Sequence, residues 1–423
     1  MGKTTQLSDG TNFKAILSSF IDYLCNQYIS VPMMYSKLQG WYDESVNAYK
    51  SYVERIGINT TKGSEIESIK VTSETESQKY NVPFEHIIEY DAHLRTVESV
   101  YFIHKQFLET QFVDLISRFD IFLQSIIRKV YYLYPDRLNG KEKKMLFEKI
   151  SSLNSIDEFK KSFIEDILDT LFRGSHYDQL DYLKDELEFD VKVHAKDVYV
   201  DFIELTERRN VLIHANGIIG DQYVNVCKER GATAYGTKGQ KLEIDIDYFK
   251  KSCDELLKLA VVIGYWFWTT RAKDERQRAD EYIINVANRL IRDKRSGVAV
   301  AIIAYVLSQE KSKSKAIYLK KFKLYQLYAL KDLGNIEQLT AGLGEDWSDV
   351  NNSIKLKLLV LENNYEGAIK LFKKIRGNEE GVNKTIFSES VIYREFIQEQ
   401  EFRNAYKEVY GEPFCCCRDS LTE

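Results

Sequence analysis

The scarcity of proline is the feature that most limits how this chain can fold. The sequence holds only 4 prolines and 21 glycines in 423 residues. Proline removes a backbone donor and glycine weakens a helix interior, so a chain poor in both can form long, uninterrupted helices. A chain of this length also exceeds one ordinary hydrophobic core, and we therefore expect two or three mainly helical domains.

Hydrophobic spacing predicts where several of these helices lie. The clearest helix is expected within 107–135 and closes at Pro135. Further helices are expected within 155–189, 196–217 and 248–270. The apolar stripe of the first of these helices contains Phe112, Leu115, Phe119, Phe122, Ile126 and Val130. The stripe of the last contains Phe249, Cys253, Leu256, Ala260, Ile263 and Phe267.

Other segments of the chain predict different structures. Residues 1–85 suggest a helical region with a polar loop over 59–83. After Asn216 and Gly217, which favour a tight turn, the segments QYVNVC and KLEIDIDY alternate apolar and polar residues. This alternation predicts a short β-ribbon inserted between helices.

The C-terminal part of the sequence shows a different pattern of helical segments. Paired helical segments recur over 272–410 with a spacing of about 35 residues, as in tetratricopeptide (TPR) repeats. The segment NNYEGAIKLF is similar to the start of the second helix of such a unit. A plain helical bundle is the alternative. Residues 411–423 form a tail with three adjacent cysteines, Cys415–Cys417, which we expect to be frayed rather than a metal site.

Composition excludes several classes of function. The net charge of −5 argues against a broadly basic nucleic-acid binder, although a local RNA site needs only a local field. The cysteines are scattered and no secretory signal is visible, so we expect a reducing cytoplasmic location. The longest apolar run, Leu259–Trp268, is too short to cross a membrane. No phosphate-binding loop or zinc motif occurs, and no metal or cofactor is expected.

One predicted helix ends in polar residues suited to chemistry, the run ERRNVLIHANG over Glu207–Gly217. Glu204 and Arg208 are spaced by four and predict a surface ion pair. Arg209 precedes His214 by five residues and so lies about 140° away around the helix axis. The two would need a second surface to complete a site. A single stripe is formed by Ile203, Glu207, Asn210 and His214.

This run resembles the R-N-x-x-x-H ribonuclease motif of HEPN domains, which are all-helical. The resemblance extends, in order and spacing, over residues 105–270 to a bacterial HEPN group associated with phage defence. The segments that carry it are SRFDIFLQSIIRKVYYLYP, LFRGSHYDQLDYLKDELEF, FIELTERRNVLIHANGIIGDQYVNVCKERG and YFKKSC. The implied architecture is a HEPN domain over 86–271, followed by the repeat over 272–410.

The resemblance implies a metal-independent endoribonuclease, active in anti-phage defence or toxin-like growth arrest, in which an RNA 2′-hydroxyl attacks the adjacent phosphate. Histidine moves protons near neutral pH and a guanidinium holds a phosphate, so Arg209, Asn210 and His214 are the expected catalytic residues. HEPN ribonucleases also imply a homodimer in which two such sets meet. The repeat would bind a protein partner or phage trigger.

Five more residues are candidates for contact with the substrate. Arg173, Ser175, His176 and Gln179 would line the same groove, or would simply cap a helix. Asp120 would brace Arg209 or His214 from behind, or pair with Arg118 or Arg128.

Other functions stay open at this stage. A HEPN scaffold can bind RNA or a nucleotide without cutting, as the partner of another defence enzyme. A purely structural helical adaptor would explain the C-terminal part but not the polar stripe. A histidine in the last turn of a helix is also favourable against the helix dipole without any catalytic role.

Overall fold

The chain folds mainly into α-helices, as a computed structural model shows. The structure describes residues 12–57, 82–139, 155–309, 314–375 and 382–414. Within these ranges the β-structure is one isolated antiparallel bridge, between Ile218 and Lys241. The all-α class expected from the sequence is confirmed.

The β-ribbon expected after Gly217 is wrong. Its first half, QYVNVC, lies entirely in α8, Asp221–Arg230, which is followed by Gly231 with a left-handed φ of 77°. A helix turns Tyr223, Val224 and Cys227 toward the same small core, whereas a strand would point Val224 to the opposite face. Of the second half, only Lys241 makes a β contact.

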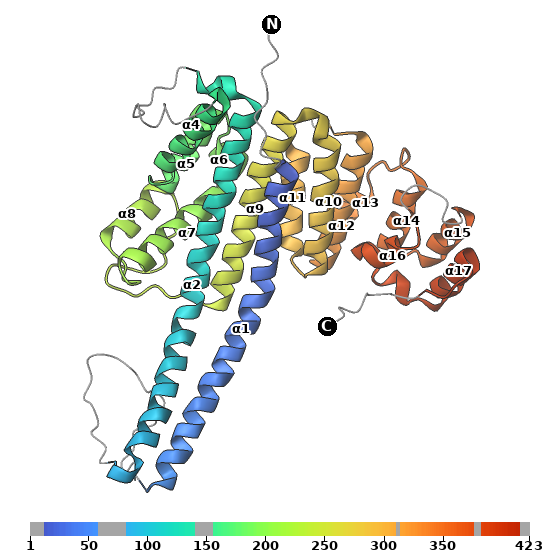
Figure 1. The fold of residues 1–423 in the computed structure, drawn as a ribbon. Helices are drawn as coiled ribbons and strands as arrows, with labels where there is room; N and C mark the ends of the chain where they lie inside the picture. The colour runs from blue at the N-terminus through green and yellow to red at the C-terminus, as the bar shows by residue number, and fades with distance from the viewer. Residues whose placement is uncertain (1–11, 58–81, 140–154, 310–313, 376–381, 415–423) are drawn as a thin grey trace.

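Two long antiparallel helices form the spine of the molecule. α1 spans Phe13–Arg55 and α2 spans Ile87–Leu133, preceded by the short 3-10 segment η1, Phe84–His86. Their upper halves pack into the body, and their lower halves project from it as a two-helix arm (Figure 1). All six apolar positions expected to form the α2 stripe are buried.

A third helix, α9, Ile246–Arg271, runs through the centre of the body. It contacts α1, α2, α7, α10 and α11, and its six expected stripe residues are fully buried. Gly264 lets α9 approach α1 closely, since a Cβ added there would meet Leu17 Cδ1 at 2.7 Å. The central position of α9 explains why its sequence is apolar on most sides.

Shorter helices surround this core (Figure 1). On one side lie α4 (Ile156–Leu171), α5 (His176–Leu187), α6 (Val191–His194), α7 (Lys196–His214) and α8, with η2 (Pro135–Leu138) after α2. On the other side lie η3 (Lys273–Glu275), α10 (Arg276–Arg292), α11 (Ser296–Ser308), α12 (Ala316–Asp332) and α13 (Ile336–Leu343). The chain ends with α14 (Asn352–Leu361), α15 (Tyr365–Ile375), α16 (Ile386–Glu389), η4 (Val391–Tyr393), η5 (Phe396–Gln398) and α17 (Gln400–Tyr410).

One hydrophobic core connects the two sides of the body, from Phe13 in α1 to Tyr406 in α17. None of the helices in the described ranges is both long enough and apolar enough to cross a membrane. Most of the expected polar loop (59–83) and the cysteines Cys415–Cys417 fall outside the described residues.

The C-terminal helices enclose the side chain of Lys357, for which the described residues supply no partner. Lys357, in α14, is only 7% exposed, and the described residues provide it no hydrogen bond or ion pair. Burial, with a smaller contribution from the nearby Lys321 ammonium, lowers the pKa of Lys357 to about 8. A charged Lys357 is therefore a local cost to stability at neutral pH.

Replacing this cation should stabilise the protein. We expect Lys357→Met to raise the free energy of unfolding at pH 7 by about 1–3 kcal/mol, because it removes a poorly solvated charge. The pKa of Lys357 is about 8 in the folded chain, and the ordinary pKa of a lysine is 10.5. Between pH 8 and pH 10.5 the unfolded wild type therefore binds more protons than the folded wild type, and the stability of the wild type rises with pH. The advantage of the variant should therefore shrink across that window.

Denaturant unfolding at pH 7 and pH 10 measures both effects. Lys355→Met, at an exposed position of the same helix, is the matched control and should leave stability nearly unchanged. A Lys357→Met protein no more stable than this control at pH 7 would contradict the account.

Candidate functional site

Helix α7 passes from the core to the surface as it approaches its end. Its residues from Phe202 to Arg208 are all buried, whereas Arg209 and Asn210 are half-buried and His214 is exposed. The expected turn follows, with left-handed φ values of 49° at Asn216 and 79° at Gly217. The polar residues singled out in the sequence thus lie where α7 reaches solvent.

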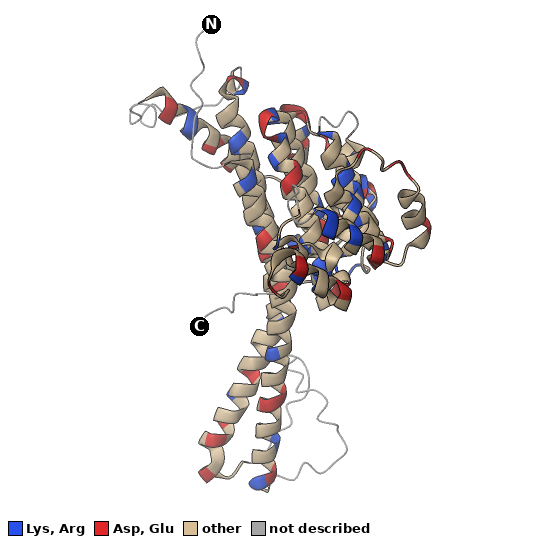
Figure 2. Ribbon diagram, turned by 90° about the vertical axis from the view of Figure 1, so that its right-hand side faces the viewer, with Lys and Arg blue, Asp and Glu red and all other residues tan. Residues whose placement is uncertain are grey.

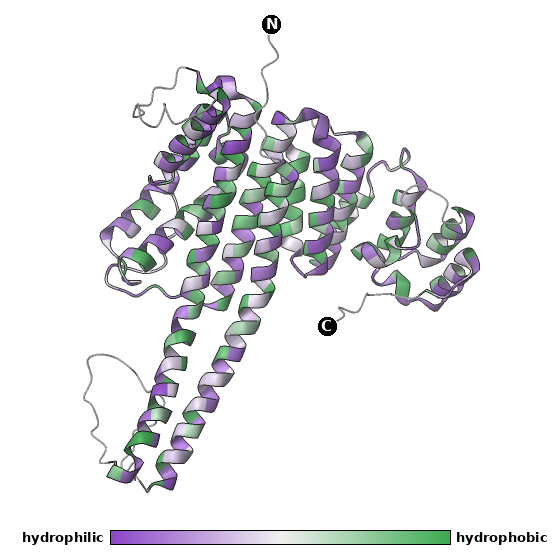
Figure 3. Ribbon diagram, viewed as in Figure 1, coloured by the Kyte–Doolittle hydropathy of each residue, from purple (hydrophilic) through white to green (hydrophobic). Residues whose placement is uncertain are grey.

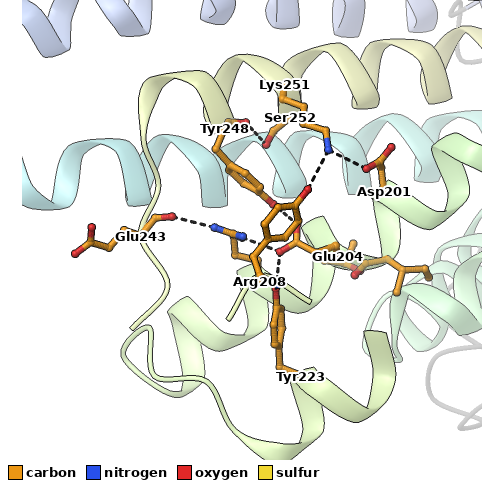
Figure 4. A network of polar contacts seen from close by, with 11 residues as sticks. Asp201, Glu204, Arg208, Tyr223, Glu243, Tyr248, Lys251 and Ser252 are labelled. Atoms are coloured by element: carbon orange, nitrogen blue, oxygen red, sulfur yellow. Dashed lines mark hydrogen bonds and ion pairs between the residues drawn. The ribbon is translucent and has the colours of Figure 1, made fainter. Parts of the chain in front are cut away.

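A buried carboxylate fixes α7 to its neighbours (Figure 4). Glu204 Oε1 accepts hydrogen bonds from Arg208 Nε at 2.8 Å and from the Tyr223 hydroxyl in α8 at 2.7 Å. Glu204 Oε2 accepts a further hydrogen bond from the Tyr248 hydroxyl in α9. Arg208 Nη1 also donates to the Glu243 carbonyl at 2.9 Å. This Glu204 network therefore ties together three helices and the segment before α9.

Arg208 is buried. The prediction that Glu204 and Arg208 form an ion pair at the surface is therefore wrong about where the pair lies. The pairing of Arg208 with Glu204 is present, but the two side chains are only 4% and 5% exposed. The guanidinium lies 3.8 Å from the centre of the Tyr248 ring, which shields it from solvent. Burial is the largest cause that raises the pKa values of Tyr223 and Tyr248, so both phenols remain protonated donors.

Removing the carboxylate should be costly. We expect Glu204→Ala to lower the free energy of unfolding by about 3–5 kcal/mol, because Arg208 is then left buried without a counter-charge. Adding Arg208→Leu to it should recover part of the loss, since no unpaired charge then remains. Thermal or denaturant unfolding gives both values.

The nearby Asp201–Lys251 ion pair provides the control. Its side chains are 37% and 44% exposed, so Asp201→Ala should cost less than about 1 kcal/mol. Equal losses in Glu204→Ala and Asp201→Ala would contradict the importance of the buried carboxylate.

A second cluster of hydrogen bonds lies one turn further along α7. Glu207, only 4% exposed, accepts from the Tyr177 hydroxyl at 2.7 Å and from Asn210 Nδ2 at 3.4 Å. Asn210 Oδ1 in turn accepts from Arg209 Nη1 at 3.3 Å. Arg209 Nε is buried and has no hydrogen-bond partner within the described part of the chain. Arg209 and Asn210 are thus oriented from behind by a buried carboxylate, with donor capacity to spare.

His214 stands apart from this cluster. It occupies the last turn of α7 and is exposed. No hydrogen bond or ion pair among the described residues joins it to Arg209, Asn210 or any other group. One copy of the chain therefore brings Arg209 and Asn210 together and leaves the imidazole open to solvent.

The other expected substrate contacts lie in different surroundings. His176 and Gln179 are buried, at 8% and 2% exposure, and His176 Nε2 lies 3.2 Å from Asp120 Oδ1. Asp120 thus faces His176, and among the described residues no hydrogen bond or ion pair joins it to Arg209 or His214. Ser175 caps α5 in a capping box with Asp178, which is the alternative left open for it.

Arg173 is exposed. The ion pairs considered for Asp120 form elsewhere, because Arg118 pairs with Asp114 and Arg128 with Glu165.

Sequence reasoning missed two residues of the cluster behind Arg209. Glu207 was placed on the polar stripe but was given no role, and Tyr177 was not considered. The signal for Glu207 was its position three residues before Asn210, which puts the two side chains on one face of the helix. Tyr177 comes from α5, and no local pattern connects it to α7.

The described ranges contain no group of three or more histidine, cysteine, aspartate or glutamate residues arranged to hold a metal ion. Comparisons with protein-family models, curated proteins and solved structures found no match to the chain.

Proposed function

We propose that this protein is a HEPN-type endoribonuclease that cleaves RNA without a metal ion. The observation that carries the proposal is the end of α7, where Arg209 and Asn210 are held by a buried carboxylate and His214 is open to solvent. The resemblance of ERRNVLIHANG to the HEPN motif supports the same residues. The proposed setting is anti-phage defence or growth arrest.

Each residue has a role that its chemistry suits. The Arg209 guanidinium, with an unpartnered Nε, would bind the scissile phosphate and offset the charge that develops there. His214 would take the proton from the attacking 2′-hydroxyl or supply one to the leaving 5′-oxygen. Asn210 would hold Arg209 and, through Glu207, keep it in place.

The separation of His214 from Arg209 bears on assembly. Since one protomer does not join them by a contact, the proposal includes a homodimer in which the Arg209 of one copy and the His214 of another face the same RNA. The C-terminal helices, α10–α17, are proposed to form a TPR-like repeat that binds a protein partner or phage trigger.

The proposal is tested by RNA cleavage with purified protein. We expect wild type to produce fragments with a cyclic phosphate and a 5′-hydroxyl in the presence of EDTA. His214→Ala and Arg209→Ala should each lower the rate by about 100-fold or more, the usual scale for losing a general acid–base or a charge clamp. Gel analysis of fragment ends measures both.

His86→Ala is the matched control, because His86 lies in η1, directly before the start of α2, and that end of α2 is at the tip of the arm, away from α7 (Figure 1). It should cleave at the wild-type rate. Cleavage that persists unchanged in His214→Ala, with folding intact, would contradict the assignment.

A second function has one observation in its favour. The absence of any described contact between His214 and Arg209 suits a HEPN partner that binds RNA or a nucleotide and does not cut. That function predicts retained RNA binding in His214→Ala, no cleavage by wild type, and no growth defect on expression. An active nuclease should instead slow growth, and Arg209→Ala should relieve the effect.

A further inference from the structure

A second arginine lies beside the cluster behind Arg209. Arg230 is the last residue of α8, and its guanidinium Cζ lies 4.7 Å from the centre of the Tyr177 ring. The hydroxyl of the same ring donates to Glu207 Oε1, the oxygen that also accepts from Asn210 Nδ2. Because Asn210 also accepts from Arg209, each of the two arginines is one side chain removed from the same carboxylate oxygen.

Neither arginine has a carboxylate of its own. The described residues give Arg230 no hydrogen bond or ion pair, and they give Arg209 only the hydrogen bond to Asn210. Asp178, the acidic residue in the first turn of α5, accepts instead from the backbone and the side chain of Ser175, each at 2.8 Å. One buried carboxylate therefore faces two guanidinium groups, and a surplus of positive charge reaches the surface there.

This surplus departs from the pattern of charge in the rest of the chain. Basic and acidic residues are interspersed along the helices in Figure 2, and many arginines meet a carboxylate, as Arg128 meets Glu165 and Arg271 meets Glu188. Helix α8 lies at the edge of the body, and hydrophilic residues predominate along it (Figure 3). An anionic partner can therefore reach this end of α8 from solvent.

The contact between Arg230 and Tyr177 suits this arginine to a phosphate. The donors of a guanidinium lie in its plane, so a ring beneath it orients the group and leaves its N–H edges free. Tyr177 is itself held by Glu207, and burial is the largest cause that raises the pKa of its hydroxyl, which therefore remains a protonated donor. A guanidinium held in this way can give paired hydrogen bonds to two oxygens of one phosphate.

The pairing of Arg209 with Arg230 favours a ligand that carries more than one phosphate. An RNA strand has a phosphate at every nucleotide, so two neighbouring guanidinium groups can bind two phosphates of the same strand. Such contacts to the backbone fix the position of a strand and carry no information about its sequence.

We infer that Arg230 forms a second phosphate subsite, which binds the RNA phosphate next to the scissile phosphate on Arg209. The inference rests on the proposed function, since it takes the ligand of Arg209 to be RNA. Arg230 holds the strand and does not touch the reacting atoms. Its loss should therefore weaken RNA binding and leave the groups proposed for the chemistry, Arg209 and His214, in place.

RNA binding by the full chain tests the inference without any cleavage. The probe is a short single-stranded RNA with 2′-fluoro riboses, and fluorescence anisotropy gives its Kd over a series of salt concentrations. Arg230→Ala should weaken binding about tenfold at low salt and reduce the slope of log Kd against log salt by about 0.7, the value for one phosphate contact on a single strand. Arg230→Lys should keep the wild-type slope but bind more weakly than wild type, because an ammonium lacks paired donors.

Lys228→Ala is the matched control. Lys228 is exposed in the same last turn of α8 but points about 200° away from Arg230 around the helix axis. Its loss removes the same charge from the end of the helix dipole and should leave both the slope and the affinity near those of wild type. All three variants should keep the wild-type circular dichroism spectrum. Equal effects of Lys228→Ala and Arg230→Ala would overturn the inference, because they would indicate a general field and no contact.

A neutral linkage locates the contact on the RNA. Each phosphate of the probe is replaced in turn by an uncharged methylphosphonate, and one replacement should weaken binding by wild type but not by Arg230→Ala. That linkage should be adjacent to the one that depends in the same way on Arg209. Wild type that does not bind the probe, or the same pattern of losses in wild type and Arg230→Ala, would overturn the inference. The expected pattern in a protein that cleaves no RNA would support the subsite and contradict only the proposed nuclease activity.

Discussion

The buried carboxylate of Glu204 is the interaction on which the arrangement of this side of the molecule depends. A carboxylate and a guanidinium inside a protein are stable only when each polar atom finds a partner, and here α7, α8, α9 and the Glu243 carbonyl supply those partners together. If α8, α9 or the Glu243 segment moved away from α7, the buried Glu204–Arg208 pair would lose a hydrogen-bond partner. The network fixes the rotation of α7 about its own axis. As a result, Arg209, Asn210 and His214 reach the surface at the end of the helix.

The long helices could be read from the sequence because their signals are local. The stripes of α2 and α9 repeat over many turns, and proline closes α2 where expected. Helix α8 could not be read in the same way. Its residues Tyr223, Val224 and Val226 favour a strand by type, yet their spacing is not a strict alternation, and burial of Tyr223 and Cys227 against the end of α7 selects a helix. Tertiary packing overrides local preference there.

The candidate site shows the same limit. The i, i+4 spacing of Glu204 and Arg208 predicted their ion pair, but the tyrosines that cover the pair, Tyr223 and Tyr248 among them, lie far along the chain. Asp120 likewise meets His176, which no sequence spacing could indicate. Local periodicity identified which polar residues of α7 share a face. The partners that orient them come from α5, α8 and α9 and needed the three-dimensional fold.

The central claim is that the end of α7 holds RNA between a fixed guanidinium and an open imidazole. A crystal structure with a short RNA whose ribose 2′-hydroxyls are replaced by fluorine, so that it cannot be cut, tests this claim most directly. We expect a phosphate on Arg209, with the His214 imidazole of another copy within about 3 Å of a reacting oxygen. RNA bound elsewhere on the molecule, with the end of α7 bare, would contradict it.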